Sequence, residues 1–144
     1  MQESFGAYIP FVDHLGFEMV FFDDGYSELR YTPEPEHMNS FNVTHGGAVM
    51  TFLDVTLASA ARSVDHGMGV VTIEMKTSFM RPARGTLTGK GRIIHRTRSM
   101  AFTEGTVFDA EGSACAHATG TFKYVNRAEA DAPKGPELHE ISTD

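Results

Sequence analysis

The stretch from residue 44 to residue 63, THGGAVMTFLDVTLASAARS, limits the possible folds more than any other part of the chain. Residues 48–61 are all apolar or small apart from four polar side chains, Thr51, Asp54, Thr56 and Ser59. A helix of this composition is apolar around most of its circumference, so it has to be buried on most sides. It is too short to cross a bilayer. The sequence therefore predicts a central helix that the rest of the domain encloses.

Segments rich in strand-forming residues lie on both sides of this helix, separated by turn signals such as Asp23-Asp24-Gly25. An antiparallel sheet of about six strands that curves around one long helix explains this order, because a strongly twisted sheet can cover most of a helix. We therefore predict a single α+β domain over residues 1–125. Its strands are expected at residues 16–22, 26–32, 70–80, 86–96, 100–108 and 114–125.

Two of these strands carry patterns that predict how they face the helix. In the segment 70–80, strict alternation places Met75 and Phe79 on one face and Thr72 on the other. In the segment 86–96, Gly89 and Gly91 share a face, which indicates close approach of another backbone or a bend in the strand.

The two ends of the chain carry weaker signals. Residues 3–9 favour a short helix that Pro10 ends, with Asp13 and His14 in the loop that follows. Residues 126–144 lose the apolar periodicity and contain two prolines and a glycine, so we expect a mobile tail there. No secretion signal and no segment of spanning length is evident, so we expect a cytoplasmic protein without a membrane partner.

Composition and motifs argue against several classes of function. The net charge of −7 argues against general affinity for nucleic acid. The single cysteine, Cys115, allows no internal disulfide and no CxxC motif, and its small neighbours predict a buried thiol. The chain contains neither a GxSxG nucleophile motif nor an HExxH zinc motif. We therefore expect neither a metal nor a cofactor.

Basic residues are concentrated between residue 75 and residue 103, where the chain has no Asp or Glu. Seven of the 12 basic side chains of this acidic chain fall in this segment. Two interpretations remain open. The segment is either a solvated strand face or a site where arginine side chains hold a phosphorylated small molecule.

The segment that leads into the central helix carries a motif. Residues 39–47 read NSFNVTHGG, Asp54 follows nine residues after the histidine, and residues 71–82 end in methionine, one variable residue and proline. Together with the strand order, this resembles the hotdog fold, and in particular the PaaI-like and 4-hydroxybenzoyl-CoA thioesterase families. One departure is Asn42, where many relatives have glycine. Asparagine tolerates the left-handed backbone region better than most residues, so the loop can keep its course.

The resemblance implies hydrolysis of an acyl-CoA thioester by a homodimer, or by a dimer of dimers, whose strands join edge to edge. Asn39 would hold the water or the carbonyl, unless it only orders its loop. Thr72 matches the position where relatives place a hydroxyl near the catalytic water, unless it is an ordinary strand threonine. CoA would lie across the sheet with its phosphates on arginines, and the candidates are Arg81, Arg84, Arg92, Arg96 and Arg98.

Thioester hydrolysis needs one group that polarises the carbonyl and another that activates water or attacks directly. Backbone N–H groups at a helix start have no partner within the helix and carry the positive end of its dipole. We therefore assign the first role to the Gly46 N–H. Asp54 takes the second role, because an apolar setting raises the basicity of a carboxylate. The sequence leaves open whether Asp54 is a general base or a nucleophile.

The spacing of these two groups constrains the assembly. Gly46 and Asp54 are eight residues apart. Along a helix that corresponds to ~12 Å at ~1.5 Å per residue. One thioester carbonyl cannot reach both groups of one chain. If both act on the same bond, they come from different copies, and the active site lies at a two-fold interface.

Three alternatives remain. His45 either fixes the loop before the helix through a hydrogen bond, which we favour, or serves as a catalytic base. A hotdog hydratase or dehydratase would use His45 and Asp54 together for acid-base chemistry. A non-catalytic acyl-CoA-binding regulatory module would need the fold and the basic surface but not Asp54. The identity of the acyl group is open.

Overall fold

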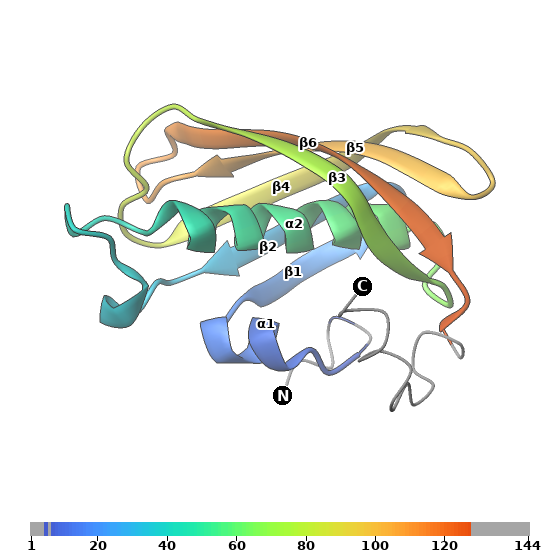
Figure 1. Cartoon of the computed structure of the whole chain (residues 1–144), viewed down its shortest axis with the longest axis horizontal. Coiled ribbons are helices and arrows are strands. Elements are labelled where there is room, and N and C mark those ends of the chain that lie inside the picture. The colour runs from blue at the N-terminus through green and yellow to red at the C-terminus, as the bar shows by residue number, and fades with distance from the viewer. Residues whose placement is uncertain (1–4, 6, 128–144) are drawn as a thin grey trace, which may run out of the picture.

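The computed structural model describes residue 5 and residues 7–127. One long helix, α2 (Gly46–Arg62), lies against a six-stranded sheet (Figure 1). The predicted tail, residues 126–144, lies almost entirely outside the described residues, so its mobility stays a prediction. The remaining elements are α1 (Pro10–Leu15), β1 (Glu18–Asp23), β2 (Tyr26–Tyr31), the 3-10 helix η2 (Pro35–His37), β3 (Gly69–Phe79), β4 (Leu87–Arg96), β5 (Met100–Phe108) and β6 (Ala114–Val125).

The sheet has the strand order β1-β2-β4-β5-β6-β3, and every neighbouring pair is antiparallel. Strands β3 and β6 curve over one side of α2, and β1 and β2 lie along its other side (Figure 1). This confirms the predicted α+β architecture, a curved antiparallel sheet of six strands around one long helix. The two edges of the sheet are β1 and β3.

Glycines in β4 allow α2 to pack very close to the sheet. A Cβ atom at Gly91 would lie 3.0 Å from the Thr56 carbonyl oxygen and 2.8 Å from Ser27 Oγ. A Cβ atom at Gly89 would lie 2.7 Å from Thr56 Oγ1. Distances under 3.0 Å are incompatible with van der Waals contact, so a side chain at either position would require Ser27, Thr56 or the helix to move. The close backbone approach predicted from Gly89 and Gly91 is therefore confirmed.

One face of α2 is less enclosed than the sequence predicted. Nine of its 17 residues are buried, but Gly47 and Met50 are exposed, and Thr51 and Asp54 are half-buried. These residues follow one another at helical spacing and form a single stripe. The face of the helix that carries Asp54 is therefore accessible in the single chain.

The amino-terminal prediction is wrong in its boundary. Residues 7–9 are not helical, residue 5 has a 3-10 conformation, and residues 3, 4 and 6 lie outside the described range. Pro10 begins α1 instead of ending a helix, because proline fits the first turn, where its missing N–H is not needed. Asp13 and His14, expected in a loop, consequently lie within α1.

Strand β3 contains a bulge that changes the predicted division of its faces. Its pairing with β6 slips by one residue between Thr72 and Glu74, which leaves Ile73 as the extra residue. Before the bulge Thr72 reaches α2, and after it Met75 packs on the core and Phe79 covers the start of α2. The expectation that Thr72 faces away from Met75 and Phe79 is therefore wrong, because strict alternation does not survive an inserted residue.

Two single-residue predictions are confirmed. The Cys115 side chain is buried, and its thiol donates to the Val107 carbonyl oxygen at 3.3 Å. Asn42 adopts the left-handed backbone conformation, with a φ of 58°. The loop before α2 therefore keeps a left-handed residue at the position where the resemblance places glycine.

Among residue 5 and residues 7–127, no helix is long and apolar enough to cross a membrane. Within the same residues, no three His, Cys, Asp or Glu side chains are grouped so that they could hold a metal ion.

Replacing Gly91 with alanine should lower the free energy of unfolding by about 1–3 kcal/mol, because the added methyl group would press on the backbone of α2. Urea denaturation measures the change. Gly67→Ala is the control, since a Cβ atom there meets only Asp65 Oδ1, at 3.6 Å. The control should shift the free energy by less than about 0.5 kcal/mol. Equal stability of the two variants would contradict the close packing of α2.

Candidate active site

The start of α2 presents one backbone N–H group without an acceptor. Gly46 is the first residue of the helix, and in the described part of the chain no acceptor is paired with its N–H. The next N–H, that of Gly47, donates to His45 Nδ1 at 2.8 Å. The Gly46 N–H thus remains available at the positive end of the helix dipole. This geometry fits the carbonyl-polarising role expected for Gly46.

His45 caps α2 and is itself held in place. Because its Nδ1 accepts the Gly47 N–H, that nitrogen carries no proton and is committed to the cap. The backbone N–H of His45 donates to the His37 carbonyl oxygen at 2.8 Å. The His37 ring is fixed in turn by the Tyr31 hydroxyl, at 2.8 Å from Nδ1. These contacts give His45 the loop-fixing position that the sequence favoured.

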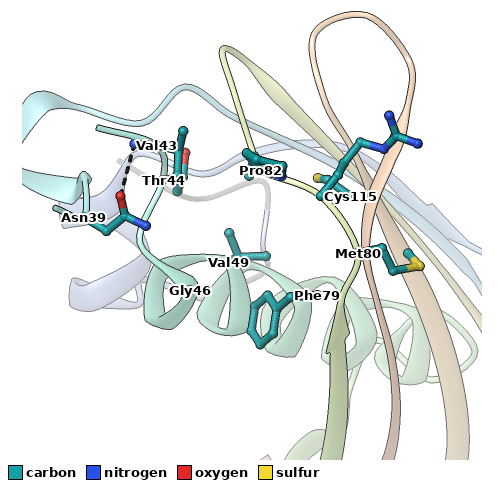
Figure 2. Close-up of a pocket in the computed structure, with 11 residues that line it drawn as sticks. Asn39, Val43, Thr44, Gly46, Val49, Phe79, Met80, Pro82 and Cys115 are labelled. Carbon is teal, nitrogen blue, oxygen red and sulfur yellow. Dashed lines mark hydrogen bonds between the residues drawn. The ribbon is translucent and has the colours of Figure 1, made fainter. Parts of the chain in front are cut away.

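Asn39 orders the loop before the helix and lines the same cavity as Gly46. Its Oδ1 accepts the Phe41 N–H at 2.8 Å and the Val43 N–H at 3.2 Å, so loop ordering accounts for the carbonyl end of the side chain. Figure 2 shows the amide nitrogen on the side nearer to Gly46. Among the described residues, no acceptor is paired with this nitrogen. It can therefore donate to a ligand in the cavity.

A cavity of ≈ 390 Å³ opens at the start of α2 (Figure 2). The Phe79 ring lies over Gly46, 3.5 Å from the position that a Cβ atom would take. Phe79 is half exposed, so the ring forms one wall of the cavity and remains open to solvent on its other side. The other walls include Thr44, Val49, Met80, Arg81 and Cys115.

Asp54 lies in the middle of α2 and is half-buried. Its Oδ1 accepts the Thr72 hydroxyl at 2.7 Å. Burial raises the pKa of Asp54 above its ordinary value, and the hydrogen bond from Thr72 opposes part of that rise. A carboxylate with a raised pKa is a stronger base than an ordinary one. Thr72 thus contacts the candidate catalytic group directly, although it lies on a strand.

Asp54 lines a second cavity, of ≈ 360 Å³, which shares no lining residue with the cavity at Gly46. Most of its walls are apolar, and they come from the amino-terminal segment, α2 and β3. Two arginines, Arg62 and Arg127, also line it. One chain therefore keeps Gly46 and Asp54 in separate cavities, as expected for two residues ~12 Å apart along a helix.

The five candidate arginines of the basic segment lie on different parts of the folded chain, and only two of them lie near the cavity at Gly46. Arg81 lines the cavity at Gly46. Arg84 is exposed and lines a neighbouring cavity that shares Val43, Thr44 and Ala83 with it. These two arginines are therefore the candidates placed to reach a ligand at the helix start.

The other three candidate arginines lie elsewhere in one chain. Arg92 forms an ion pair with Glu104 on the sheet. Arg96 lies over the Tyr124 ring, 4.9 Å from its centroid. Arg98 belongs to the connection between β4 and β5. The sequence left the five candidate arginines unranked, and these three do not line the cavity at Gly46 of the same chain.

Two residues that line these cavities, Phe79 and Arg62, are not among those that the sequence predicts for the site. The position of Phe79 depends on the bulge in β3, for which the sequence gives no signal. His37, whose carbonyl oxygen accepts the His45 N–H, lines neither cavity and is also not predicted from the sequence. Arg62 follows Asp54 by eight residues, so the helical period would have placed it two turns further along a similar side of α2.

A curved six-stranded antiparallel sheet around one long helix is the hotdog class of fold. Residues 41–116 match the family model described as the thioesterase superfamily. This match covers more than half of the 144 residues, so the chain belongs to the thioesterase superfamily.

Individual relatives agree with this family. The Saccharolobus solfataricus protein named "Putative esterase SSO2140" is 28% identical over 133 residues, which are 92% of this chain and 94% of that one. The Escherichia coli acyl-coenzyme A thioesterase PaaI is 27% identical over 84 residues, which are 57% of this chain and 59% of that one.

Solved structures show the same fold. The conserved protein PA5202 of Pseudomonas aeruginosa superposes with a TM-score of 0.76 at 29% identity, over 82% of this chain and 95% of that one. A hypothetical thioesterase protein of Streptococcus pneumoniae, solved with coenzyme A, superposes with a TM-score of 0.70 at 21% identity, over 76% of this chain and 86% of that one.

Asp54→Asn should stabilise the domain as the pH rises. The raised pKa means that the fold disfavours the ionised carboxylate. Below the ordinary pKa of 3.8 the group is protonated and this cost is absent, whereas the folded protein loses stability as the pH rises through the raised pKa. Asparagine does not ionise and can still accept the Thr72 hydroxyl. Urea denaturation gives the free energy of unfolding of each protein at a series of pH values. The values for the wild type and the variant should converge at acidic pH, and the variant should be the more stable of the two at higher pH. A wild type that gains on the variant with rising pH would contradict this.

His45→Ala should lower the free energy of unfolding by about 0.5–2 kcal/mol, because the Gly47 N–H loses its acceptor. His45→Asn should retain most of the stability, since asparagine is a favoured cap. Urea denaturation measures both variants, and a thioesterase assay on the same samples adds a second measurement. A positioning role predicts that His45→Asn also keeps most of the activity. A catalytic base at His45 predicts instead that both variants lose activity to the same degree.

Proposed function

We propose that this protein hydrolyses an acyl-CoA thioester to the free acid and CoA, in active sites formed between two copies of the chain. Membership of the thioesterase superfamily supports thioester hydrolysis as the reaction. The E. coli relative PaaI, named an acyl-coenzyme A thioesterase, supports acyl-CoA as the substrate class. Asp54 and the Gly46 N–H are the two groups that this chain offers for the chemistry.

The observation that carries the proposal is that one strand contacts both groups. Thr72, near one end of β3, bonds to Asp54, and Phe79, at the other end, covers Gly46. If two copies of β3 pair antiparallel about a two-fold axis near the middle of the strand, the Thr72 end of one chain lies beside the Phe79 end of the other. Asp54 of one copy then approaches Gly46 of its partner.

Strand β3 is suited to such pairing. It is 11 residues long, lies at the edge of the sheet and, among the described residues, pairs only with β6. A long exposed edge strand is a template for pairing with another chain. Its apolar side chains are also unusually accessible, with Val71 45% and Ile73 52% exposed. Burial of these side chains against a second copy would add to the hydrogen bonds of a shared ladder.

In the proposed reaction the thioester carbonyl oxygen accepts the Gly46 N–H of one chain, with the Asn39 amide nitrogen as a second donor. Asp54 of the other chain removes a proton from water, and the hydroxide forms a bond to the carbonyl carbon. The C–S bond then breaks and CoA leaves as a thiol once it has taken up that proton. In the nucleophilic variant, Asp54 itself attacks the carbon, the C–S bond breaks and CoA leaves as a thiolate. Water then hydrolyses the resulting anhydride, which frees the acid and Asp54 and supplies the proton that the thiolate takes up. Either route places Thr72 as the hydrogen-bond donor that orients the carboxylate.

The CoA portion is assigned to the surface around the cavity at Gly46. Arg81 and Arg84 are exposed there, and their planar guanidinium groups match the geometry of phosphate. The S. pneumoniae structure with coenzyme A supports a CoA site on this fold. Arg92 is a weaker candidate, because Glu104 already neutralises its charge.

Two alternative functions are less well supported. A hydratase would need a free basic nitrogen on His45, whereas Nδ1 is committed to the Gly47 N–H. A non-catalytic acyl-CoA-binding module would not need a carboxylate with a raised pKa bonded to Thr72.

The test is complementation between two inactive variants. Asp54→Asn removes the base and should lower turnover by about 10²–10⁴-fold. Gly46→Pro removes the N–H and adds a ring beside Phe79. The helix should tolerate it, because proline is favoured at the first helical position and His45, with φ −58° and ψ 136°, already has a backbone suited to precede it. Gly46→Ala keeps the N–H and serves as the matched control, which should remain active.

Mixing the two inactive variants should restore about a quarter of the wild-type turnover, because about half of the randomly formed dimers are mixed and each has one intact site. Acyl-CoA hydrolysis is followed by thiol release after the chains have exchanged. Size-exclusion chromatography confirms that both variants remain dimers. No recovery of activity in exchanged dimers would refute a site shared between chains.

A further inference from the structure

The cavity at Asp54 contains a buried arginine that the proposed chemistry does not use. Arg62 lies in the last turn of α2, is only 8% exposed, and lines the same ≈ 360 Å³ cavity as Asp54. Its Nη1 donates to the Phe5 carbonyl oxygen at 2.6 Å and its Nε to the Met68 carbonyl oxygen at 3.3 Å. A guanidinium has five N–H donors, so three remain. Within the described residues, no acceptor is paired with these three.

The charge of Arg62 is not compensated by a carboxylate. In the part of the chain that the structure describes, no carboxylate oxygen lies within 4.0 Å of this guanidinium. Burial, and then the positive charge of Arg127, lower the pKa of Arg62, so its surroundings disfavour the cation. The guanidinium lies over the Phe22 ring, 5.8 Å from its centroid, which offsets part of the cost of burying the charge. A buried charge without a counter-ion remains costly unless an anion joins it. The charged residues that line the cavity are Asp54, Arg62 and Arg127.

The cavity leads from the reacting group to this arginine. Asp54 and Arg62 are eight residues apart on α2, which is ~12 Å or roughly two turns. The walls between them are formed by small or apolar side chains of α2 and β3, such as Val55, Ala58 and Val70. An acyl chain that begins at the thioester beside Asp54 would therefore pass along apolar walls and end at the Arg62 guanidinium.

We propose that Arg62 determines the acyl specificity of this enzyme by binding a carboxylate at the far end of the acyl group. The preferred substrates are then ω-carboxyacyl-CoA thioesters, that is, CoA esters of dicarboxylic acids. The inference rests on the proposed thioesterase function. A carboxylate can accept two parallel N–H bonds from a guanidinium, which suits the donors that Arg62 has left.

A purely structural role for Arg62 is the main rival. The two bonds to the Phe5 and Met68 carbonyls tie the amino-terminal segment and the connection before β3 to the end of α2. Neutral donors would serve that purpose without burying a charge. The rival predicts that substitution of Arg62 affects all acyl-CoA substrates equally, whereas carboxylate binding predicts a loss confined to ω-carboxyacyl substrates.

The experiment compares matched substrates on the full-length protein. Thiol release is measured with adipyl-CoA against hexanoyl-CoA and with suberyl-CoA against octanoyl-CoA, pairs that differ only at the terminal group. For the wild type, kcat/KM should be about 10- to 100-fold higher for the carboxylated member of at least one pair, the range expected of a charge-assisted hydrogen bond. Wild-type preference for both methyl-terminated substrates would overturn the proposal.

Two variants of Arg62 separate charge from structure. Arg62→Gln should abolish the preference for the carboxylated substrate while the methyl-terminated substrate, measured on the same sample, reports that the fold is intact. Arg62→Lys keeps the charge and should retain part of the preference. Arg30→Gln, an exposed β2 residue, is the matched control and should leave the ratio unchanged. Equal losses for both substrates in Arg62→Gln would assign Arg62 to structure alone.

A binding measurement separates this proposal from the proposed reaction. Adipate should shift the melting temperature of the wild type more than hexanoate does at the same concentration and ionic strength, and Arg62→Gln should remove the difference. If no acyl-CoA is hydrolysed but adipate still binds through Arg62, the thioesterase proposal fails and the carboxylate site stands. If hydrolysis occurs with no adipate effect and no carboxylate preference, the carboxylate site fails alone.

Discussion

The close packing of α2 on the glycines of the sheet is the constraint on which the rest of the molecule depends. At Gly91 and Gly105 a Cβ atom would lie within 3.0 Å of backbone oxygen or helix side-chain atoms, so the helix lies at a distance from the sheet that glycine permits and a larger residue does not. Interiors packed to this density transmit small shifts instead of absorbing them. The packing therefore fixes the position of α2 against the sheet. Its start and its middle keep fixed positions relative to β3, and the two chemical groups keep theirs.

The electrostatics of the two cavities differ in a way that suits their proposed roles. At the start of α2, the polarising group is a backbone dipole, which needs no counter-charge and no protonation. In the middle of the helix, Asp54 is a carboxylate whose pKa burial raises, and Arg62 further along is a cation whose pKa burial lowers. Both side chains are thus less stable in their charged forms than in water. A proton would stabilise Asp54, and a negatively charged ligand group would stabilise the Arg62 cation.

Much of this arrangement could be predicted from the sequence because it depends on periodicity. The apolar run of α2, the strand order and the close approach at Gly91 all follow from residue spacing. Asn42 in a left-handed conformation followed from the chemistry of asparagine. The accessible face of α2 that carries Asp54 could not be predicted, because the composition of a helix does not show whether its own chain covers every apolar face.

Other features depend on contacts distant in sequence and left no local signal. Pro10 could end one helix or begin another, and only the packing of α1 decided between them. The scattered positions of Arg92 and Arg96 result from pairing with Glu104 and Tyr124 on neighbouring strands. The bulge at Ile73 has a further consequence for how this chain can vary. Its single extra residue brings both ends of β3 round to the helix, so shortening the strand there would turn Phe79 outward and uncover Gly46. The number of residues between Thr72 and Phe79 therefore has to stay constant.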